Sequence, residues 1–443
     1  MTTVNLRILC VAVLAAAFPA LAQQPATQPP VTQPPVGSPQ AEVAQTPLDW
    51  KALEAPFLTN HTQLTFPDRF VKAGEAYFSP DANWIIFQAI EQPKADAPAD
   101  PFYTMYVARL NRNAGSVSLE SITRVSPTGS ANTCGWFDPD NESAVIFGST
   151  VVRPSDDQKS GFQVGTRKYV WQFPQEMEIV TISPFLMGGG LAVPSAEGSG
   201  RSFRAGPSDM SHAKPQPLFE RPNYDAEGSF SKDGRFLLYA HVEDRPDTQG
   251  ADAEQPYRPD ANLYIFDRET KTHHPIVSAV GYDGGPFFHP NDGFICFRSD
   301  RKGNDLLQIF VADLKHEESA DGTNIPIGID QEWQLTDNEH VNWCPYWHPS
   351  GDYLVYATSE ISHRNYEVFA IEANVWKLRG GQDPATLKRS RVTQADGADV
   401  LPAFSTDGSM MMWTSQRGGK ITGEERPSSQ LWIANVTGSP FPK

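Results

Sequence analysis

One pattern recurs six times along the 443-residue chain: an aromatic residue lies two positions before a Pro-like position, and an Asp-like residue and a short apolar stretch follow. Successive Pro-like positions are separated by 59, 93, 58, 59 and 57 residues. Self-similarity at a period of tens of residues is the signature of a repeat fold. The six copies are Tyr77–Asp81, Trp136–Asp140, Ser229–Asp233, Phe287–Asn291, Tyr346–Ser350 and Ala403–Asp407.

Each repeat carries the signals of four short antiparallel strands. An apolar run such as Phe236–Tyr239 follows the turn, and pairs such as Asp407–Gly408 suit a tight hairpin. A four-stranded sheet cannot bury both faces alone, whereas radial stacking of six sheets buries them and leaves only short edges. The sequence therefore predicts an all-β, six-bladed β-propeller. The aromatic residues before the turns, which we expect in the core, are Phe78, Phe137, Phe230, Phe288, Trp347 and Phe404.

The last repeat ends near Val436 and lacks a fourth strand. His61–Thr65, which precedes the first repeat, matches the fourth strand of another repeat at Gln334–Thr336. We expect this N-terminal strand to pair into the last blade and close the ring, because no edge is then left open. The predicted propeller spans residues 61–443, with blades starting near 74, 133, 226, 284, 343 and 400. Residues 184–215 are predicted to be an insertion loop, whose role the sequence does not reveal, and residues 244–260 an acidic loop.

The N-terminus has the features of an export signal. Arg7 precedes an apolar run, and Ala20–Ala22 supplies a small-x-small cleavage pattern, so residues 1–22 are predicted to be a signal peptide. The run is too short for a membrane span. Residues 23–60 are interpreted as a disordered linker, because the Pro- and Gln-rich part of this stretch buries little apolar surface. We expect a periplasmic or secreted protein, and the net charge of −17 excludes nucleic acid as a favoured partner.

The units Tyr-Phe-Ser-Pro-Asp, Ser-Phe-Ser-Lys-Asp-Gly and Ala-Phe-Ser-Thr-Asp-Gly resemble the repeat of TolB-type propellers, also called WD40-like PD repeats. The resemblance covers residues 61–436 and implies a six-bladed propeller and export. Periplasmic TolB carries an additional α/β domain before its propeller, and this sequence has no counterpart of it. The resemblance therefore does not imply a role in the Tol–Pal system.

Five of the six positions that lie seven residues before the Pro-like position are Asp or Asn. In a propeller this position begins the innermost strand, at the mouth of the central channel. Carboxylates that face one channel focus a negative potential, which suits a cationic peptide segment or a hard cation. The alternative is that these side chains cap turns through local backbone hydrogen bonds. The predicted binding residues, which include two Glu residues two positions further along, are Asp225, Glu227, Asp283, Asn342, Asp399, Asn132 and Glu75.

Two other residue pairs share equivalent slots in different repeats. His289 and His348 stand where other repeats have Ser, so stabilisation of the turn is favoured over metal binding or general-base chemistry. Cys134 and Cys344 belong to opposite blades, too far apart for a disulfide. We therefore expect free, buried thiols.

The chain contains no Gly-x-Ser-x-Gly elbow, no His-Glu-x-x-His and no phosphate loop. The sequence thus predicts an exported, non-catalytic, monomeric scaffold that binds a protein, a peptide or a cell-envelope component through the channel mouth and loops. The alternative is a propeller enzyme, a metal-dependent polysaccharide lyase or hydrolase, since the distantly related oligogalacturonate lyases use propeller His with a metal. No cofactor is predicted, and a divalent cation at the channel mouth is the one option left open.

Overall fold

Strands dominate the structure, a computed structural model that describes residues 48–443 apart from 95–96, 114, 142, 155–160, 164–167, 171–172, 184–208, 213, 244–259, 321, 421–422 and 442–443. The predicted signal peptide, the linker up to residue 47 and most of the two predicted loops lie outside the described residues. The described helices are α1 (Trp50–Glu54), α2 (Val375–Arg379) and a 3-10 turn at Pro384–Thr386. None of the described helices is long and apolar enough to cross a membrane.

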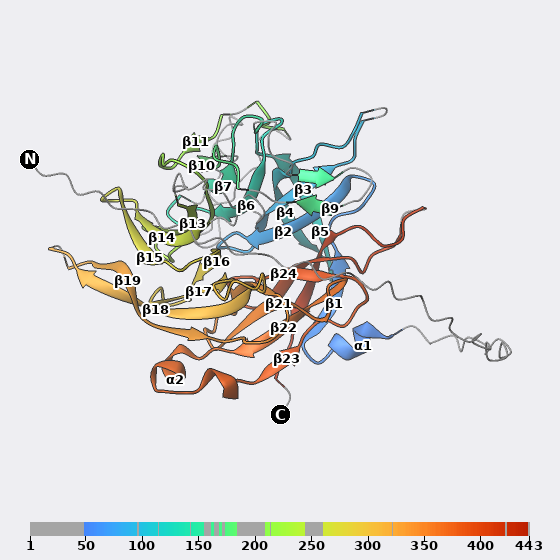
Figure 1. Cartoon of the computed structure of the whole chain (residues 1–443). Coiled ribbons are helices and arrows are strands. Elements are labelled where there is room, and N and C mark those ends of the chain that lie inside the picture. Colours follow the sequence, from blue (N-terminus) through green and yellow to red (C-terminus); the bar gives the residue numbers. More distant parts are fainter. Residues whose placement is uncertain are drawn as a thin grey trace, which may run out of the picture. The chain divides into compact units, whose positions relative to one another are not determined.

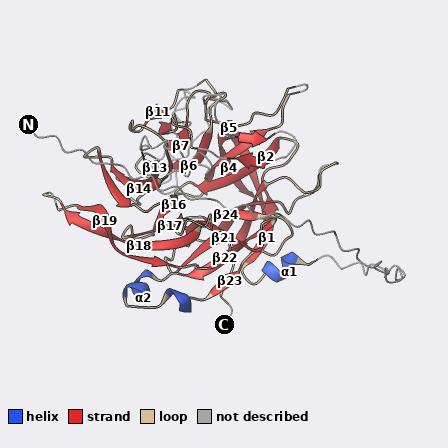
Figure 2. Cartoon of the chain, in the orientation of Figure 1, coloured by secondary structure: helices blue, strands red, loops and turns tan. Residues whose placement is uncertain are grey.

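Six antiparallel sheets of four strands each account for nearly all described strands (Figure 2). Blade 1 contains β2 (Phe70–Phe78), β3 (Trp84–Glu91), β4 (Thr104–Asn113) and β5 (Ser116–Arg124). Blade 2 contains β6 (Asn132–Phe137), β7 (Val145–Ser149), β10 (Glu178–Ile182) and β11 (Gln216–Pro217), and the separate hairpin β8 (Gly161–Gln163) and β9 (Lys168–Val170) lies between β7 and β10 in the chain. Blade 3 contains β12 (Asp225–Phe230), β13 (Phe236–Val242), β14 (Ala261–Asp267) and β15 (Thr272–Val277). Blade 4 contains β16 (Asp283–Phe288), β17 (Phe294–Ser299), β18 (Gln308–Glu318) and β19 (Asn324–Gln334). Blade 5 contains β20 (Asn342–Trp347), β21 (Tyr353–Ser362), β22 (Asn365–Glu372) and β23 (Arg389–Arg391), and blade 6 contains β24 (Asp399–Phe404), β25 (Met410–Ser415), β26 (Gln430–Val436) and β1 (Leu58–Gln63).

The first strands of the blades form a closed ring (Figure 1). β2 contacts β6, β6 contacts β12, and the series continues through β16, β20 and β24 back to β2. Apolar side chains from neighbouring sheets pack between the blades, as Ile146 and Ile179 of blade 2 do against Leu237 of blade 3. The prediction of a six-bladed propeller is therefore confirmed.

The N-terminal strand closes the last blade, as predicted. β1 pairs antiparallel with β26, with Leu58 opposite Val436 and Gln63 opposite Trp432. The predicted linker boundary at residue 60 was wrong, because α1 lies inside that stretch and β1 begins at Leu58. Glu54, at the end of α1, is only 2% exposed, so this segment is part of the folded domain.

The turn between the first two strands explains why the repeat motif recurs. In blade 3 the Ser231 hydroxyl donates to the Asp233 carboxylate at 2.7 Å and accepts from the Phe236 backbone N–H at 3.0 Å. The same pair of bonds occurs in blades 1 and 6. Each motif therefore satisfies the polar groups of its own tight hairpin.

His289 and His348 perform the same task in blades 4 and 5. His289 Nδ1 accepts from the Asn291 backbone N–H at 3.1 Å, and His348 Nδ1 accepts from the Ser350 backbone N–H at 3.1 Å. The other nitrogen of His289 lies 3.2 Å from the Gly351 carbonyl oxygen of the next blade. A Cβ at Gly351, where φ is +73°, would lie 2.4 Å from that nitrogen, so glycine is required there. The turn-stabilising role is confirmed, and each histidine also braces the next blade.

Candidate binding site in the central channel

A bulge interrupts the innermost strand of every blade at the same position. In each first-strand pair the register shifts next to one residue with positive φ. Such a bulge re-aims a side chain, which here points into the channel. All six bulge residues line one chamber of about 20 Å³ on the channel axis; they are Glu75, Cys134, Glu227, Gly285, Cys344 and Leu401.

Charged and apolar side chains line the chamber, which has space for about one water molecule. Glu227 accepts from Tyr282 Oη at 2.6 Å and from Arg298 Nη2 at 3.1 Å, and Tyr282 Oη also accepts from Arg298 at 2.7 Å. Glycine is required beside this group, because a Cβ at Gly285 would lie 2.2 Å from Arg298 Nη1 and one at Gly284 would lie 2.1 Å from Tyr282 Oη. The chamber therefore holds a preorganised acid–tyrosine–arginine group.

A second carboxyl group of the chamber, Glu75, has a different environment. Cys134 Sγ donates to Glu75 Oε1 at 3.0 Å. Burial raises the pKa of Glu75, and the charge of Glu227 raises it further, although the bond from Cys134 opposes both. Burial likewise raises the pKa of the Cys134 thiol and brings that of Cys344 to about 12. Cys134, Cys296 and Cys344 are free cysteines as predicted, although Cys134 is half-buried rather than buried.

The predicted acids of the channel mouth each begin an innermost strand, as expected from their spacing. Asp225, Asp283 and Asp399 are almost fully buried, and each contacts a nitrogen side chain of its own blade, which is an arginine for Asp283 and Asp399 and a histidine for Asp225. Burial raises the pKa of all three carboxyl groups, and the hydrogen bonds to these partners oppose that shift. The pairs are Asp225 with His241 at 2.8 Å, Asp283 with Arg301 at 3.0 Å and Asp399 with Arg417 at 2.6 Å.

Asn132 and Asn342 occupy the same position in blades 2 and 5, where the bonds are to neutral groups. Asn132 Nδ2 donates to the Tyr103 carbonyl oxygen at 2.7 Å, and Asn342 Nδ2 donates to Gln308 Oε1 at 3.0 Å. A carboxylate thus occurs where the partner is an arginine or a histidine, and an amide where the partner is a carbonyl or amide oxygen. This matching supports a structural role for the position and weakens the predicted negative potential at this mouth, while the predicted binding role stays a prediction.

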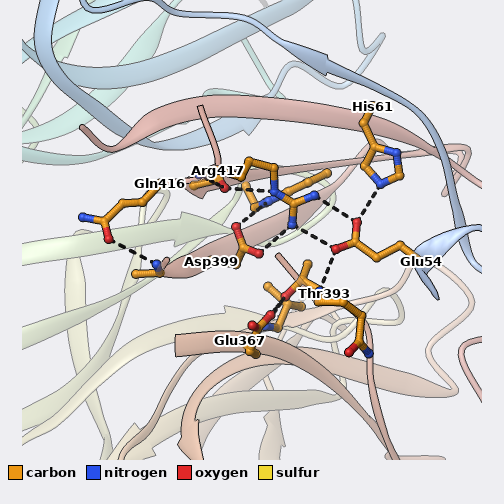
Figure 3. Close-up of polar contacts among 12 residues, drawn as sticks. Glu54, His61, Glu367, Thr393, Asp399, Gln416 and Arg417 are labelled. Carbon is orange, nitrogen blue, oxygen red and sulfur yellow. Dashed lines mark hydrogen bonds and ion pairs between the residues drawn. The ribbon is translucent and has the colours of Figure 1, made fainter. Parts of the chain in front are cut away.

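Arg417 joins the N-terminal segment to blade 6 in a buried cluster (Figure 3). Its guanidinium donates two bonds to Glu54, of 2.9 and 3.1 Å, and one to Asp399. The Gln394 backbone N–H donates to Glu54 at 2.6 Å, and His61 Nε2 lies 2.7 Å from the same carboxylate. We name Glu54, His61, Asp399 and Arg417 the closure cluster.

Aromatic rings surround the closure cluster. The Arg417 guanidinium lies 4.4 Å from the ring centre of Trp50 and 4.9 Å from that of Trp413. Burial alone would raise the pKa of Glu54, but the contacts from His61 and Arg417 hold it below the usual value. This cluster was not predicted from the sequence, because Glu54 comes from the stretch interpreted as linker.

Four aromatic rings fill the channel next to the chamber. Tyr77, Trp136, Phe287 and Tyr346 all contact one another, with ring centres 5.0 to 6.3 Å apart. Trp136 and Phe287 line both the chamber and the space on the other side of the rings. We name these four residues the aromatic floor. The floor divides the channel into the small chamber and an open end.

The open end is a funnel of about 330 Å³ to which all six blades contribute. The side chains of Trp136, Phe287 and Tyr346 form its bottom, and all three are half-buried. Five of the six aromatics before the turns are buried as predicted, but Phe288 is half-buried and lines this funnel. Other lining residues are Pro80, Pro139, Lys232, His289, Pro290, Asp292, Pro349 and Thr406.

The described residues contain no group of three or more His, Cys, Asp or Glu side chains placed to hold a metal ion. The predicted site residues therefore fall into separate environments. Glu75 and Glu227 share the chamber, whereas Asp225, Asp283 and Asp399 are held by partners in their own blades. Asn132 and Asn342 instead bond to the preceding blade, through Tyr103 and Gln308. The funnel lies at the other end of the innermost strands, among the turns.

The strand pairing defines the chain as a six-bladed β-propeller with a blocked channel and an apolar funnel. Solved structures with a similar fold include a putative TolB from Agrobacterium tumefaciens, which is 14% identical, with a TM-score of 0.43 and coverage of 83% of this chain and 91% of that chain. TolB from Acinetobacter baumannii is 14% identical, with a TM-score of 0.41 and coverage of 83% and 64%. An oligogalacturonate lyase from Vibrio parahaemolyticus is 13% identical, with a TM-score of 0.42 and coverage of 86% and 94%. No protein-family model and no curated protein matches the chain. TolB structures are thus among those that the chain resembles, as the repeats predicted, and the likeness concerns the fold alone.

Proposed function

We propose that this chain is an exported propeller scaffold that binds a segment of another protein, or of a cell-envelope component, in the funnel. The observation that carries the proposal is the funnel itself. Ligand sites are concave, mostly apolar and of at least about 300 Å³, with a few polar groups at their margins. The funnel has this size, aromatic and proline walls, and Lys232 and Asp292 among its lining residues.

The opposite end of the channel supports the proposal by contrast. Of its three buried carboxyl groups, those of Asp283 and Asp399 are paired with arginines and that of Asp225 lies against His241, so a cationic partner finds less uncompensated charge there than the sequence predicted. Half-buried aromatic rings, which are the side chains that most often anchor protein partners, lie instead at the bottom of the funnel. We therefore place the proposed contact at the funnel rather than at the predicted acidic mouth. A propeller enzyme stays the alternative prediction.

Site-specific photo-crosslinking tests the choice of face. p-Benzoylphenylalanine replaces Thr406, an exposed residue of the funnel, or Val280, which is 84% exposed and precedes the other end of β16. We expect the Thr406 variant to crosslink a partner in an envelope extract, and the crosslinked segment, made as a peptide, to lose affinity when Phe288 is changed to Ala. Crosslinking from Val280 alone would refute the funnel as the binding face. Export is tested separately by N-terminal sequencing, which should find a mature chain that starts at Gln23.

A further inference from the structure

The turns that surround the funnel are strongly acidic. They carry eight acidic residues and two basic ones, Lys232 and Arg235. Asp138 is neutralised by Arg268 at 2.9 Å, and Arg235 pairs with Asp267, which lies outside these turns, at 2.9 Å. Glu142 lies outside the described residues, and the remaining turn carboxyl groups belong to Asp81, Asp140, Asp233, Asp292, Asp352 and Asp407.

Five of these six carboxyl groups, all but that of Asp292, belong to exposed residues. Bonds from the Ser405 hydroxyl and the Ser409 backbone N–H lower the pKa of Asp407, so this group is ionised at neutral pH. Burial raises the pKa of Asp292 to about 6, which still leaves that group mostly ionised at neutral pH. The turns around the funnel, which we call its rim, therefore bear a net negative charge, although the charged residues that line the funnel itself are Asp292 and Lys232. The chain as a whole carries −17.

The bottom of the funnel complements this charge. The rings of Trp136, Phe287 and Tyr346 contact one another and retain exposed surface. An aromatic ring attracts a cation held over its face, most strongly where water is excluded. The chamber behind the floor adds no net positive charge, because Glu75 and Glu227 share it with the single cation Arg298.

From this combination of an acidic rim and an aromatic floor, and resting on the proposed function above, we propose that the anchor of the bound segment is a lysine or arginine side chain of a partner protein. Such a side chain has an apolar stem that suits the Pro and Phe walls, and a cationic head that reaches the floor. The blocked channel stops the side chain there, so the partner contributes one anchoring side chain rather than a threaded strand. The rim carboxylates would repel an anionic side chain, and an uncharged aliphatic side chain would gain no electrostatic attraction from them.

Peptides that differ only in charge test this assignment on the unaltered protein. We compare acetyl-Gly-Gly-X-Gly-Gly-amide by calorimetry, where X is lysine, trimethyllysine or the uncharged carbon isostere of trimethyllysine. We expect the trimethyllysine peptide to bind at least about twofold more tightly than its isostere, which is the lower end of the cation–π range. This preference should shrink as the salt concentration rises from 0.05 to 0.5 M, because screening weakens the attraction of the rim.

Two variants locate the effect. Tyr346→Leu should abolish the preference for the charged peptide while retaining binding of the isostere, and Trp376→Leu, a change of a 58% exposed tryptophan that does not line the funnel, should leave both unchanged. Circular dichroism melts verify that each variant is folded. Equal affinity of the charged and uncharged peptides would overturn the cationic anchor and leave binding in the funnel intact. Binding of no peptide at all would overturn both, and equal binding of free butylammonium would overturn a protein segment as the occupant.

Discussion

The closure cluster makes a sharp prediction about stability, because it ties α1 to blade 6 through one buried carboxylate. We consider Glu54→Gln, which preserves the size of the side chain and removes its charge. The glutamine would keep an acceptor for the Gln394 backbone N–H but would bring an amide group against the guanidinium of Arg417. Arg417 would then have Asp399 as its one carboxylate partner in the cluster.

The magnitude follows from burial. The side chains of Glu54 and Arg417 are 0% and 1% exposed, so neither group can recover its interactions from water. Loss of one partner from a buried ion pair costs about 3–5 kcal/mol, because the remaining charge stays desolvated. Since Asp399 still compensates part of the charge of Arg417, we expect a loss of about 3 kcal/mol in the free energy of unfolding.

Urea unfolding followed by tryptophan fluorescence measures this loss, and Trp50 and Trp413 report directly on the cluster. The matched control is Glu269→Gln, since Glu269 pairs with Arg235 at 2.7 Å but its side chain is 64% exposed. Exposed pairs contribute about 0–1 kcal/mol, so the control should hardly move the midpoint. Equal small effects in both variants would refute the claim that α1 is a structural part of the propeller.

Three further predictions concern buried polar groups. Burial raises the pKa of Glu367 and Glu178 from 4.5 to about 8, so the folded protein retains protons that the unfolded chain has released. The contribution of these two groups to stability should therefore be greatest below about pH 4.5 and fall as the pH rises toward 8. Urea midpoints measured from pH 5 to 9 should vary less with pH in the double Gln variant than in the unaltered protein. Asn342→Asp should destabilise by more than about 2 kcal/mol in urea, because it removes three donated bonds and introduces a buried charge without a cation partner; a neutral result would contradict the charge matching between blades. Cys296 and Cys344 should not react with a thiol reagent at pH 8 until urea unfolds the protein, because burial raises the pKa of both thiols; rapid labelling of the folded chain would show that the channel side of the blades is open to solvent.

The fold was predictable because its information is local and repeated. Each Ser-x-Asp turn satisfies its own hydrogen bonds, as Ser405 and Asp407 do, so this short motif marks blades 1, 3 and 6 even where the rest of the sequence differs. In blades 2, 4 and 5, Asp138, His289 and His348 take the place of the serine. The closing strand was predictable for the same reason, since His61–Thr65 resembles the fourth strand of another repeat. Helix α1 was not predictable, because five residues are too few for a stable isolated helix and its position depends on the distant Arg417.

The position of the mouth acids was predictable, but their charge environment was not. The repeat of the motif along the sequence shows which residues begin the innermost strands. Their partners His241, Arg301 and Arg417 come from other parts of the same blade, and the repeat does not identify them. One signal could have revealed two of the pairs: Ser-x-Arg occurs at Ser299–Arg301 and Ser415–Arg417, in equivalent places of the blades that begin with Asp283 and Asp399. In both blades the serine accepts from the arginine Nε, which aims the guanidinium at the aspartate.

The channel is blocked by the side chains that face its axis near the end of each innermost strand. Side chains alternate along a strand, so the aromatic two positions before the Pro-like residue packs between blades and the residue three positions before it faces the axis. Blades 1, 2, 4 and 5 place Tyr77, Trp136, Phe287 and Tyr346 there, whereas blades 3 and 6 place the small residues Ser229 and Ala403. Four large rings and two small side chains fill the cross-section without a passage, which is why the contacts among the rings are close. A partner can therefore approach the floor from the funnel side and must end there, so a single deep side chain, rather than an extended strand, is the contact that this geometry selects.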